Sequence, residues 1–228
     1  MKIKTYQAPL LLKRKETHDT MTFRFGINMD FRPGQFVMLN AGGRSEAFSV
    51  CSPPTDNGYI EISMKMTGSA YKKALDDAKT GDKFEIKGPY GHFLLDGSKG
   101  AIMIAGGIGI TPFMSMISYA TAKKLPTKIT LLYSNKTPED IAFRKEFDEL
   151  QKQNKNLGVI HTITRPEGHE WSGRTGRVDE EMIKSVPYWK GALFYVCGPG
   201  EMVDSMTALL QGMGITKERI KAERFGGY

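Results

Sequence analysis

The sequence predicts a two-domain protein in which an antiparallel β-barrel is followed by an α/β domain with a parallel sheet. Up to about Leu95 the chain reads as short strands separated by turn residues. From Ala101 onward, apolar strands alternate with helical segments. The turn-rich stretch "LDGSKG" at residues 95–100 separates the two patterns. We therefore predict one domain over residues 1–97 and a second over residues 98–228.

Short strands bounded by Asp, Asn, Gly or Pro dominate the first half, and several of them alternate polar and apolar residues. This pattern favours an antiparallel sandwich or barrel. The predicted strands cover residues 8–16, 20–27, 35–41, 46–52, 58–66 and 82–88. One helix is expected at residues 69–79, where Tyr71, Ala74, Leu75 and Ala78 fall on one helical face.

The second half alternates strands and helices, as a parallel sheet with crossover helices does. Strands are expected at residues 101–105, 129–134, 159–164 and 192–198, and helices at 112–124, 142–153 and 201–214. In such sheets, ligands bind beyond the carboxyl ends of the strands. The residues after these strands are therefore the first candidates for a binding site.

A glycine-rich turn, "AGGIGITP", follows the first strand of the second half. Gly107 and Gly109 can turn tightly and let a ligand approach the backbone. Pro112 suits the first turn of a helix, and a helix N-terminus attracts phosphate. The turn predicts a pyrophosphate cradle, with a plain strand-to-helix turn as the alternative.

The other three strands of this half also end in small, polar or basic residues, which is what a nucleotide groove requires. These residues are Ser134 and Asn135, Thr164 and Arg165, and Gly198 and Pro199. Four such strand ends are much less expected by chance than one. Their agreement favours the nucleotide-binding interpretation of the glycine-rich turn.

The composition is that of a globular protein with a basic surface. The chain has 228 residues, with 32 basic and 25 acidic residues and a net charge of +7. Basic residues are interleaved with acids, as in "KKALDDAK", so we expect an acidic protein or an anionic small molecule as partner and no nucleic acid. No apolar run approaches the roughly 20 residues that span a bilayer. The two cysteines and four histidines show no metal-ligand spacing, so we expect no metal, and a reduced, cytoplasmic setting.

The order of motifs along nearly the whole chain resembles that of the ferredoxin–NADP reductase superfamily. The motifs are "PGQF", "AFSVCSPP", "MKMTGSAY", "GPYGHF", "GGIGITP" and "CGPGEM". The resemblance implies a flavin-binding barrel followed by a nucleotide-binding domain. Cys51 and Cys197 form no CxxC pattern, so we expect no cysteine-ligated iron–sulfur cluster within this chain. It implies FAD, with FMN as the alternative, together with NAD(P)H. Hydride would pass to the flavin, and electrons would then pass to a ferredoxin, a flavodoxin, an oxygenase component, a haem protein or a small molecule.

On the flavin side, the resemblance assigns the segment of Glu46, Ala47, Phe48 and Ser49 to the flavin. Phe48 would lie against the ring, and the Ser49 hydroxyl would bond near its N5 atom. Backbone groups of Met64, Lys65 and Met66 would edge the flavin, and N–H groups of Ser69, Ala70 and Tyr71 would face its phosphates. Phe225, or less favourably Tyr228, would stack on the open face of the ring.

On the nucleotide side, the resemblance implies that Gly107, Gly109, Thr111 and Pro112 hold the pyrophosphate and ribose. The remaining groove residues would be Ser134, Asn135, Thr164, Arg165, Cys197, Gly198, Pro199 and Met202. Cys197 would lie near the nicotinamide. The predicted catalytic residues are Ser49, Cys197 and Glu223, the last two steadying charge or a proton near the reacting atoms.

Two positions depart from the family pattern. Glu46 stands where the family has an arginine, and a carboxylate repels a flavin phosphate. Arg44, Lys72 or Lys73 could supply the missing cation, or the flavin is bound weakly. Tyr71 stands where serine or threonine is usual, which removes a small hydroxyl.

Two other functions remain open from the sequence: an electron-transfer subunit of a larger complex, and a regulatory nucleotide-binding module that has lost its flavin. The donor also has two candidates. The second strand of this half ends in Ser134, Asn135 and Lys136 rather than in the acid that would favour NADH. Arg165, Arg174 and Arg177 could meet a 2′-phosphate, which slightly favours NADPH over NADH.

Overall fold

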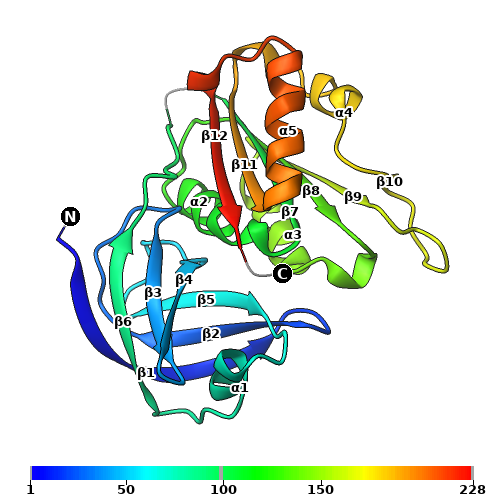
Figure 1. Cartoon of the computed structure of the whole chain (residues 1–228). Helices are drawn as coiled ribbons and strands as arrows, with labels where there is room; N and C mark the ends of the chain where they lie inside the picture. Colours follow the sequence, from blue (N-terminus) through cyan, green and yellow to red (C-terminus); the bar gives the residue numbers. More distant parts are fainter. Residues whose placement is uncertain (1, 98–99, 227–228) are drawn as a thin grey trace. The chain divides into compact units, whose positions relative to one another are not determined.

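The computed structural model describes residues 2–97 and 100–226, and these residues form two compact units. The first unit contains the chain up to Leu95 together with Thr111–Tyr119. The second contains Asp96–Ile110 and the chain from Ala120. Figure 1 shows the strands and helices of each unit.

The first unit is a six-stranded antiparallel sheet in the order β4-β3-β6-β1-β2-β5. Its elements are β1 (Lys4–Lys15), β2 (Thr20–Gly26), β3 (Phe36–Ala41), β4 (Arg44–Ser49), β5 (Tyr59–Lys65), α1 (Ala70–Asp76) and β6 (Lys83–Tyr90). An antiparallel bridge between Val50 and Ile62 links the ends of the two outer strands. This link curls the sheet into the predicted barrel.

Alternate residues of the barrel strands point inward and form its core. Fully buried members include Leu10, Phe23, Phe25, Leu39 and Ile60. In β3 the burial alternates residue by residue, as the two-residue period of a strand with one core face requires. The predicted helical face of α1 joins this core through Tyr71 and Leu75.

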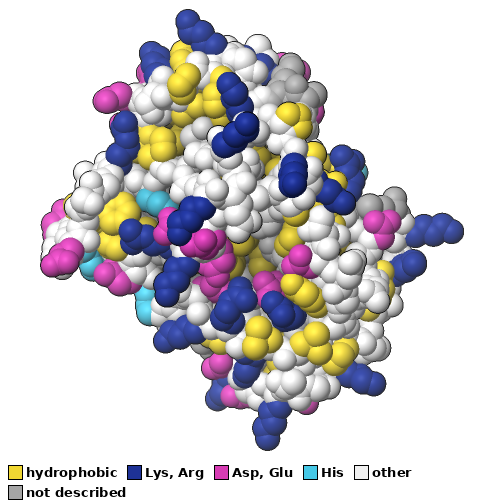
Figure 2. All heavy atoms as spheres, turned by 180° about the vertical axis from the view of Figure 1, so that it is seen from behind, with side chains coloured by type: hydrophobic (Ala, Val, Ile, Leu, Met, Phe, Trp, Pro, Cys, Tyr) yellow, Lys and Arg dark blue, Asp and Glu magenta, His cyan; other side chains and the backbone are white. Residues whose placement is uncertain are grey.

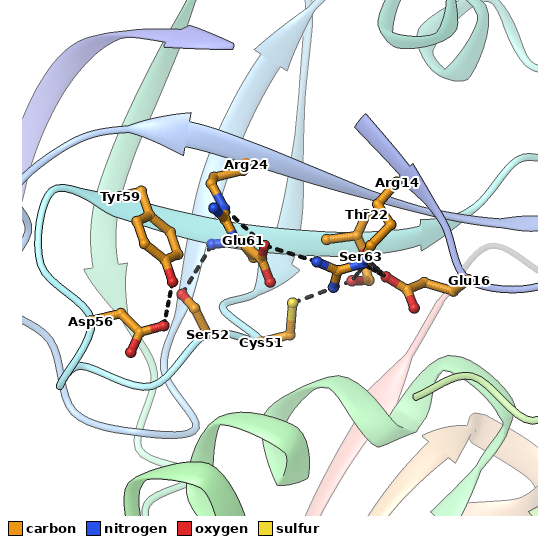
Figure 3. A network of polar contacts seen from close by, with 10 residues as sticks. All are labelled: Arg14, Glu16, Thr22, Arg24, Cys51, Ser52, Asp56, Tyr59, Glu61 and Ser63. Atoms are coloured by element: carbon orange, nitrogen blue, oxygen red, sulfur yellow. Dashed lines mark hydrogen bonds and ion pairs between the residues drawn. The ribbon is translucent and has the colours of Figure 1, made fainter. Parts of the chain in front are cut away.

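A polar network covers another face of the β1, β2 and β5 strands (Figure 3). Glu61, with 11% of its side chain exposed, accepts hydrogen bonds from Arg24 Nε at 2.9 Å and from Arg14 Nη1 at 3.4 Å. Beside it, the Thr22 and Ser63 hydroxyl groups share a 2.6 Å hydrogen bond. A carboxylate this deeply buried is tolerated because two guanidinium groups compensate its lost hydration.

The second unit is a six-stranded parallel sheet in the order β10-β9-β8-β7-β11-β12. The strands are β7 (Ala101–Gly106), β8 (Ile129–Asn135), β9 (Leu157–Ile163), β10 (Arg174–Thr175), β11 (Leu193–Pro199) and β12 (Ile220–Phe225). The α-helices of this half of the chain are α2 (Thr111–Ala122), α3 (Arg144–Gln153), α4 (Glu180–Lys184) and α5 (Gly200–Gly212), and residues Thr111–Tyr119 of α2 group with the first unit. Short 3-10 turns are η1 (Gly107–Ile110), η2 (Pro138–Asp140), η3 (Trp189–Gly191) and η4 (Lys217–Arg219).

Every residue of β7 is buried, as expected for a central strand of a sheet that is covered on both faces. Its side chains join those of β8, β11, α4 and α5 in one apolar cluster. The predicted fold class, an antiparallel barrel followed by a parallel α/β domain, is therefore confirmed.

The structure differs from the sequence-based expectation in three elements and in one grouping. Strands β10 and β12 and the short helix α4 were not predicted. β10 has two residues, and β12 is an edge strand that mixes polar and apolar residues without an apolar run. The segment Thr111–Tyr119, which the sequence assigns to residues 98–228, groups with the first unit. It does so because the Phe113 ring packs 5.7 Å from that of Phe93 and the Ser115 hydroxyl donates to the Ser52 carbonyl at 2.7 Å.

On the face drawn in Figure 2, basic and acidic side chains lie among one another. Figure 2 shows lysine and arginine side chains interleaved with acidic ones on the face opposite to that of Figure 1. This pattern matches the interleaving expected from the sequence. No helix within the described residues is long and apolar enough to cross a membrane.

Replacing Glu61 by alanine should destabilise the protein, because Arg14 and Arg24 would face each other without their shared carboxylate. We expect a loss of about 2 kcal/mol in the free energy of unfolding and a fall of about 5 °C in the thermal midpoint. Calorimetry of the flavin-free chain measures both. The control is Glu85→Ala, at an exposed position of β6, which should change stability by less than about 0.5 kcal/mol. Equal effects of the two substitutions would contradict the role given to the network.

Candidate functional site

A cluster of predicted flavin residues lies where β4, β5 and α1 meet in the first unit. We call it the aromatic–lysine cluster; it consists of Glu46, Phe48, Met64, Tyr71 and Lys72. Phe48 and Tyr71 stack with ring centroids 6.0 Å apart and planes 25° apart. The Tyr71 hydroxyl donates to the Leu39 carbonyl at 2.8 Å, and burial raises the pKa of this phenol. Tyr71 is thus a neutral anchor that holds one side of the Phe48 ring.

Lys72 occupies the centre of the aromatic–lysine cluster, although the sequence named it only as one of three possible cations. Its Nζ atom lies 4.2 Å from the centroid of Phe48, 3.3 Å from Glu46 Oε2 and 3.4 Å from Met64 Sδ. Burial lowers the pKa of Lys72, and the carboxylate of Glu46 opposes that shift. The signal in the sequence was the pair of lysines after the predicted phosphate loop, but the sequence did not distinguish Lys72 from Lys73.

The remaining predicted flavin residues surround this cluster along the chain. Ser49 is buried at the end of β4, and Ala47 precedes Phe48 on the same strand. The Lys65 ammonium binds the Asp19 carboxylate at 2.7 Å, and the Met66 N–H donates to the Asp19 carbonyl. Asp19 of the barrel therefore holds both the Lys65 side chain and the Met66 backbone at the end of β5.

The start of α1 contains the other two predicted phosphate-loop residues. Ser69 caps α1 and accepts a hydrogen bond from the Lys72 N–H at 3.3 Å, and Ala70 begins the helix. The cap fixes the first turn of α1, and with it the position from which the Lys72 side chain extends.

In the second unit, the predicted nucleotide residues meet at the carboxyl edge of the parallel sheet. Gly106 at the end of β7 pairs with Ser134 of β8. The Thr164 N–H donates to the Asn135 carbonyl at 2.9 Å, and the Arg165 N–H donates to the Lys136 carbonyl at 2.8 Å. Adjacent strand ends thus bring together residues that are far apart in the sequence, as parallel topology requires.

Glycine is present at Gly107 and at Gly109 for different structural reasons. A Cβ atom at Gly109 would overlap the carbonyl of Cys197, so this position requires glycine for close backbone packing. Gly107 has a φ of +51°, and a Cβ atom there would meet no described atom within 4 Å. The backbone at Gly107 is therefore open to an approaching ligand, whereas Gly109 positions the turn against β11.

Met202 fills the space between two other glycines of this edge. Its sulfur would lie 2.5 Å from a Cβ atom placed at Gly106 and 2.8 Å from one placed at Gly198. The thioether therefore packs against both backbones, next to Pro199 at the end of β11. Of the predicted groove residues, Met202 has a packing role that explains its presence.

Cys197 and Glu223 are opposite each other on β11 and β12. Cys197 is fully buried, and this burial, reinforced by Glu223, raises its thiol pKa well above the ordinary value. Burial raises the pKa of Glu223 to about 7, and its Oε2 atom has no hydrogen-bond partner among residues 2–97 and 100–226. The Cys197 thiol therefore holds its proton at neutral pH and has no thiolate character. The Glu223 carboxyl, whose pKa lies near neutrality, is protonated in about half of the molecules, so both groups are potential hydrogen-bond donors.

The remaining predicted contacts are at Thr111, Pro112 and Phe225. Thr111, which is buried, and Pro112 begin α2 directly after the glycine-rich turn. Phe225 is the last residue of β12 and pairs with Pro199. Tyr228, the alternative stacking residue, lies outside the described residues.

The residues present fit a flavin in the first unit and a dinucleotide in the second. The aromatic–lysine cluster offers a ring surface at Phe48 and an ammonium group at Lys72, which suit an aromatic ring and an anionic phosphate. The carboxyl edge offers open backbone at Gly107, which suits a pyrophosphate.

Comparison with known proteins agrees with this arrangement. Residues 7–94 match the family described as an oxidoreductase FAD-binding domain, and residues 103–208 match the family described as an oxidoreductase NAD-binding domain. NADH-cytochrome b5 reductase 2 of Danio rerio is 30% identical over 260 residues, which cover 95% of this chain and 84% of that protein.

Two solved structures share the fold at lower identity. A cytochrome P450 reductase of Amycolatopsis has a TM-score of 0.88 and 21% identity, covering 98% of this chain and 70% of its own. A ferredoxin NADP+ reductase from Neisseria gonorrhoeae with bound FAD and NADP has a TM-score of 0.82 and 21% identity, covering 97% and 98%.

Alanine substitutions at Gly107 and Gly109 should lower the free energy of unfolding by different amounts. Gly109→Ala forces a backbone overlap with Cys197, and we expect it to lower the free energy of unfolding by about 3 kcal/mol. Gly107→Ala places a side chain in open space at a left-handed φ, and we expect a loss of about 1 kcal/mol. Urea denaturation measures both. Similar losses at the two positions would contradict the distinction between packing and open backbone.

Stability should fall with rising pH because of Glu223. Its folded pKa of about 7 exceeds the ordinary value of 4.5, so the folded chain holds the proton more tightly than the unfolded chain does. The loss of folding free energy caused by ionising Glu223 is absent below about pH 4.5, grows up to about pH 7 and is constant above that pH. Relative to wild type, Glu223→Gln should gain about 2 kcal/mol between pH 4 and pH 8, a figure discounted for the part of the side chain that solvent reaches.

Unfolding of the flavin-free chain at each pH measures this gain. The control, Glu167→Gln at an exposed loop position, should leave the pH profile of wild type unchanged. A Glu223→Gln profile parallel to that of wild type would refute the assignment.

Proposed function

The chain belongs to the ferredoxin reductase-like family and is a flavin-dependent NAD(P)H oxidoreductase that uses FAD, and from this premise we propose that it reduces an acidic one-electron carrier protein. The relatives named above are reductases of cytochrome b5, cytochrome P450 and ferredoxin. A net charge of +7 favours encounter with an acidic partner. The acceptor we propose is a ferredoxin, a flavodoxin or a small haem protein, met in the cytoplasm.

The observation that carries the proposal is that one chain contains both sites. The first unit has the aromatic–lysine cluster, and the second has the open carboxyl edge with Gly107. A protein with only the second site would bind a nucleotide without accepting its hydride. The first site therefore argues against a regulatory module that has lost its flavin.

Bound FAD supplies a hydride acceptor that can release electrons singly. The chain's own residues would bind and orient the reactants. Phe48 would support the ring, and the Ser49 hydroxyl would donate a hydrogen bond to it. The Cys197 thiol, and the Glu223 carboxyl in its protonated form, would donate hydrogen bonds near the nicotinamide without competing as nucleophiles.

We further propose NADPH as the preferred donor. Arg165, Arg174 and Arg177 have exposed side chains, and none of them forms an ion pair within the described part of the chain. Free guanidinium groups suit the 2′-phosphate that distinguishes NADPH from NADH. Arg165 directly follows Thr164 at the carboxyl edge, next to Asn135.

The first test is the visible absorption spectrum of the purified chain, recorded with and without added FAD and then with NADPH or NADH in the absence of oxygen. We expect a flavin spectrum that bleaches with either donor, faster with NADPH, followed by reduction of an added ferredoxin, flavodoxin or cytochrome b5. Bleaching without turnover of any free carrier would indicate an electron-transfer subunit of a larger complex. A chain that retains no flavin would contradict the oxidoreductase function, and faster bleaching by NADH would overturn the donor preference.

A further inference from the structure

Within the aromatic–lysine cluster, a buried lysine faces a carboxylate at the position where the family has an arginine. We propose that Lys72 is the cation that binds the phosphate of the flavin, and that Glu46 holds this ammonium until the phosphate replaces it. The inference rests on the proposed function and assigns the flavin-phosphate contact to a residue of α1 rather than to the strand β4. The site would thus take its positive charge from α1, because an acidic residue occupies the position of the family's arginine.

The contact between Lys72 and Glu46 is incomplete as an ion pair. The lysine side chain is 11% exposed, whereas the glutamate side chain is 42% exposed. Their 3.3 Å separation exceeds the 2.7–2.9 Å typical of charge-assisted hydrogen bonds. A buried ammonium with one long contact to a half-exposed carboxylate has gained little for its lost hydration. It would therefore gain from a second, better-placed anion.

The other contacts of Lys72 do not satisfy an ammonium group fully. An –NH3⁺ group has three donors. Within the described residues, one is directed to Glu46 and one to the weak acceptor Met64 Sδ at 3.4 Å. The faces of Phe48 and Tyr71, 4.2 and 5.1 Å from Nζ, add cation–π attraction without accepting a hydrogen bond in the usual sense. A phosphate, with several acceptor oxygens, would complete the set.

The structure also separates Lys72 from the other two candidate cations. Arg44 is exposed at the start of β4, and Lys73 is exposed on α1. Only the ammonium of Lys72 lies against the Phe48 ring, which the resemblance assigns to the flavin. A cation at this place can hold the charged end of a ligand whose ring contacts Phe48, whereas the exposed cations would interact through water at most.

The experiment compares three flavins that differ in the phosphate. Riboflavin has none, FMN has one, and FAD has a pyrophosphate. Their dissociation constants are measured by quenching of flavin fluorescence on titration with the purified chain. The variants are Lys72→Met, which keeps a long apolar side chain beside Met64, and Lys73→Met, the matched control one position along α1.

For Lys72→Met we expect the dissociation constants of FAD and FMN to rise about tenfold to hundredfold, as loss of a partly buried charge-assisted contact does. The dissociation constant of riboflavin should change by less than about twofold. Lys73→Met should leave all three constants within about twofold of wild type. Glu46→Gln should tighten FAD and FMN binding several-fold, because it removes the competing carboxylate.

A double variant, Glu46→Arg with Lys72→Met, tests directly whether the position of the cation has moved. It places the cation at the family's position, and we expect it to recover most of the FAD affinity lost in Lys72→Met. Recovery would also show that Lys72→Met retains its fold.

Three outcomes would overturn the inference: an equal loss for riboflavin, an equal loss in Lys73→Met, or weaker FAD binding in Glu46→Gln. These differ from failure of the proposed function, in which the wild-type chain itself would bind no flavin.

Discussion

The close packing of the glycine-rich turn against β11 is the constraint on which the carboxyl edge of the parallel sheet depends. Gly109 lies so near the Cys197 carbonyl that no side chain fits between them. This contact holds the turn at the carboxyl end of the sheet and leaves the backbone of Gly107 open. Gly109 packs the turn against β11, and Gly107 leaves backbone accessible to a ligand.

Burial governs the chemistry of the titratable groups at both candidate sites. It raises the pKa of Glu223 and of the Cys197 thiol, and it lowers the pKa of Lys72. All three shifts disfavour the charged form. For a protein whose bound cofactor carries the redox chemistry, such residues are suited to donating hydrogen bonds and binding an anion, rather than to acting as nucleophiles.

The aromatic–lysine cluster shows how one departure from a family pattern can be explained by another. Glu46 alone looks like a defect in an anion site. Tyr71 alone looks like the loss of a small hydroxyl. In the structure the Tyr71 ring supports Phe48, and Lys72 binds Glu46 from the next position of α1. Taken together, the two substitutions belong to one packed arrangement in which the positive charge comes from the helix.

The sequence by itself determined the order of the two domains, the strands of the barrel, the central strands of the parallel sheet and the glycine-rich turn, because each depends on local periodicity or on residues adjacent in the chain. It also predicted the cofactors correctly through the order of its motifs. It did not identify the edge strand β12, which mixes polar and apolar residues without an apolar run and whose place depends on pairing with β11. Only the tertiary structure distinguished Lys72 from Lys73 and Arg44, since burial and contacts across strands have no signature in neighbouring residues. The same is true of the pairing of Cys197 with Glu223, which lie on different strands and meet only when the sheet forms.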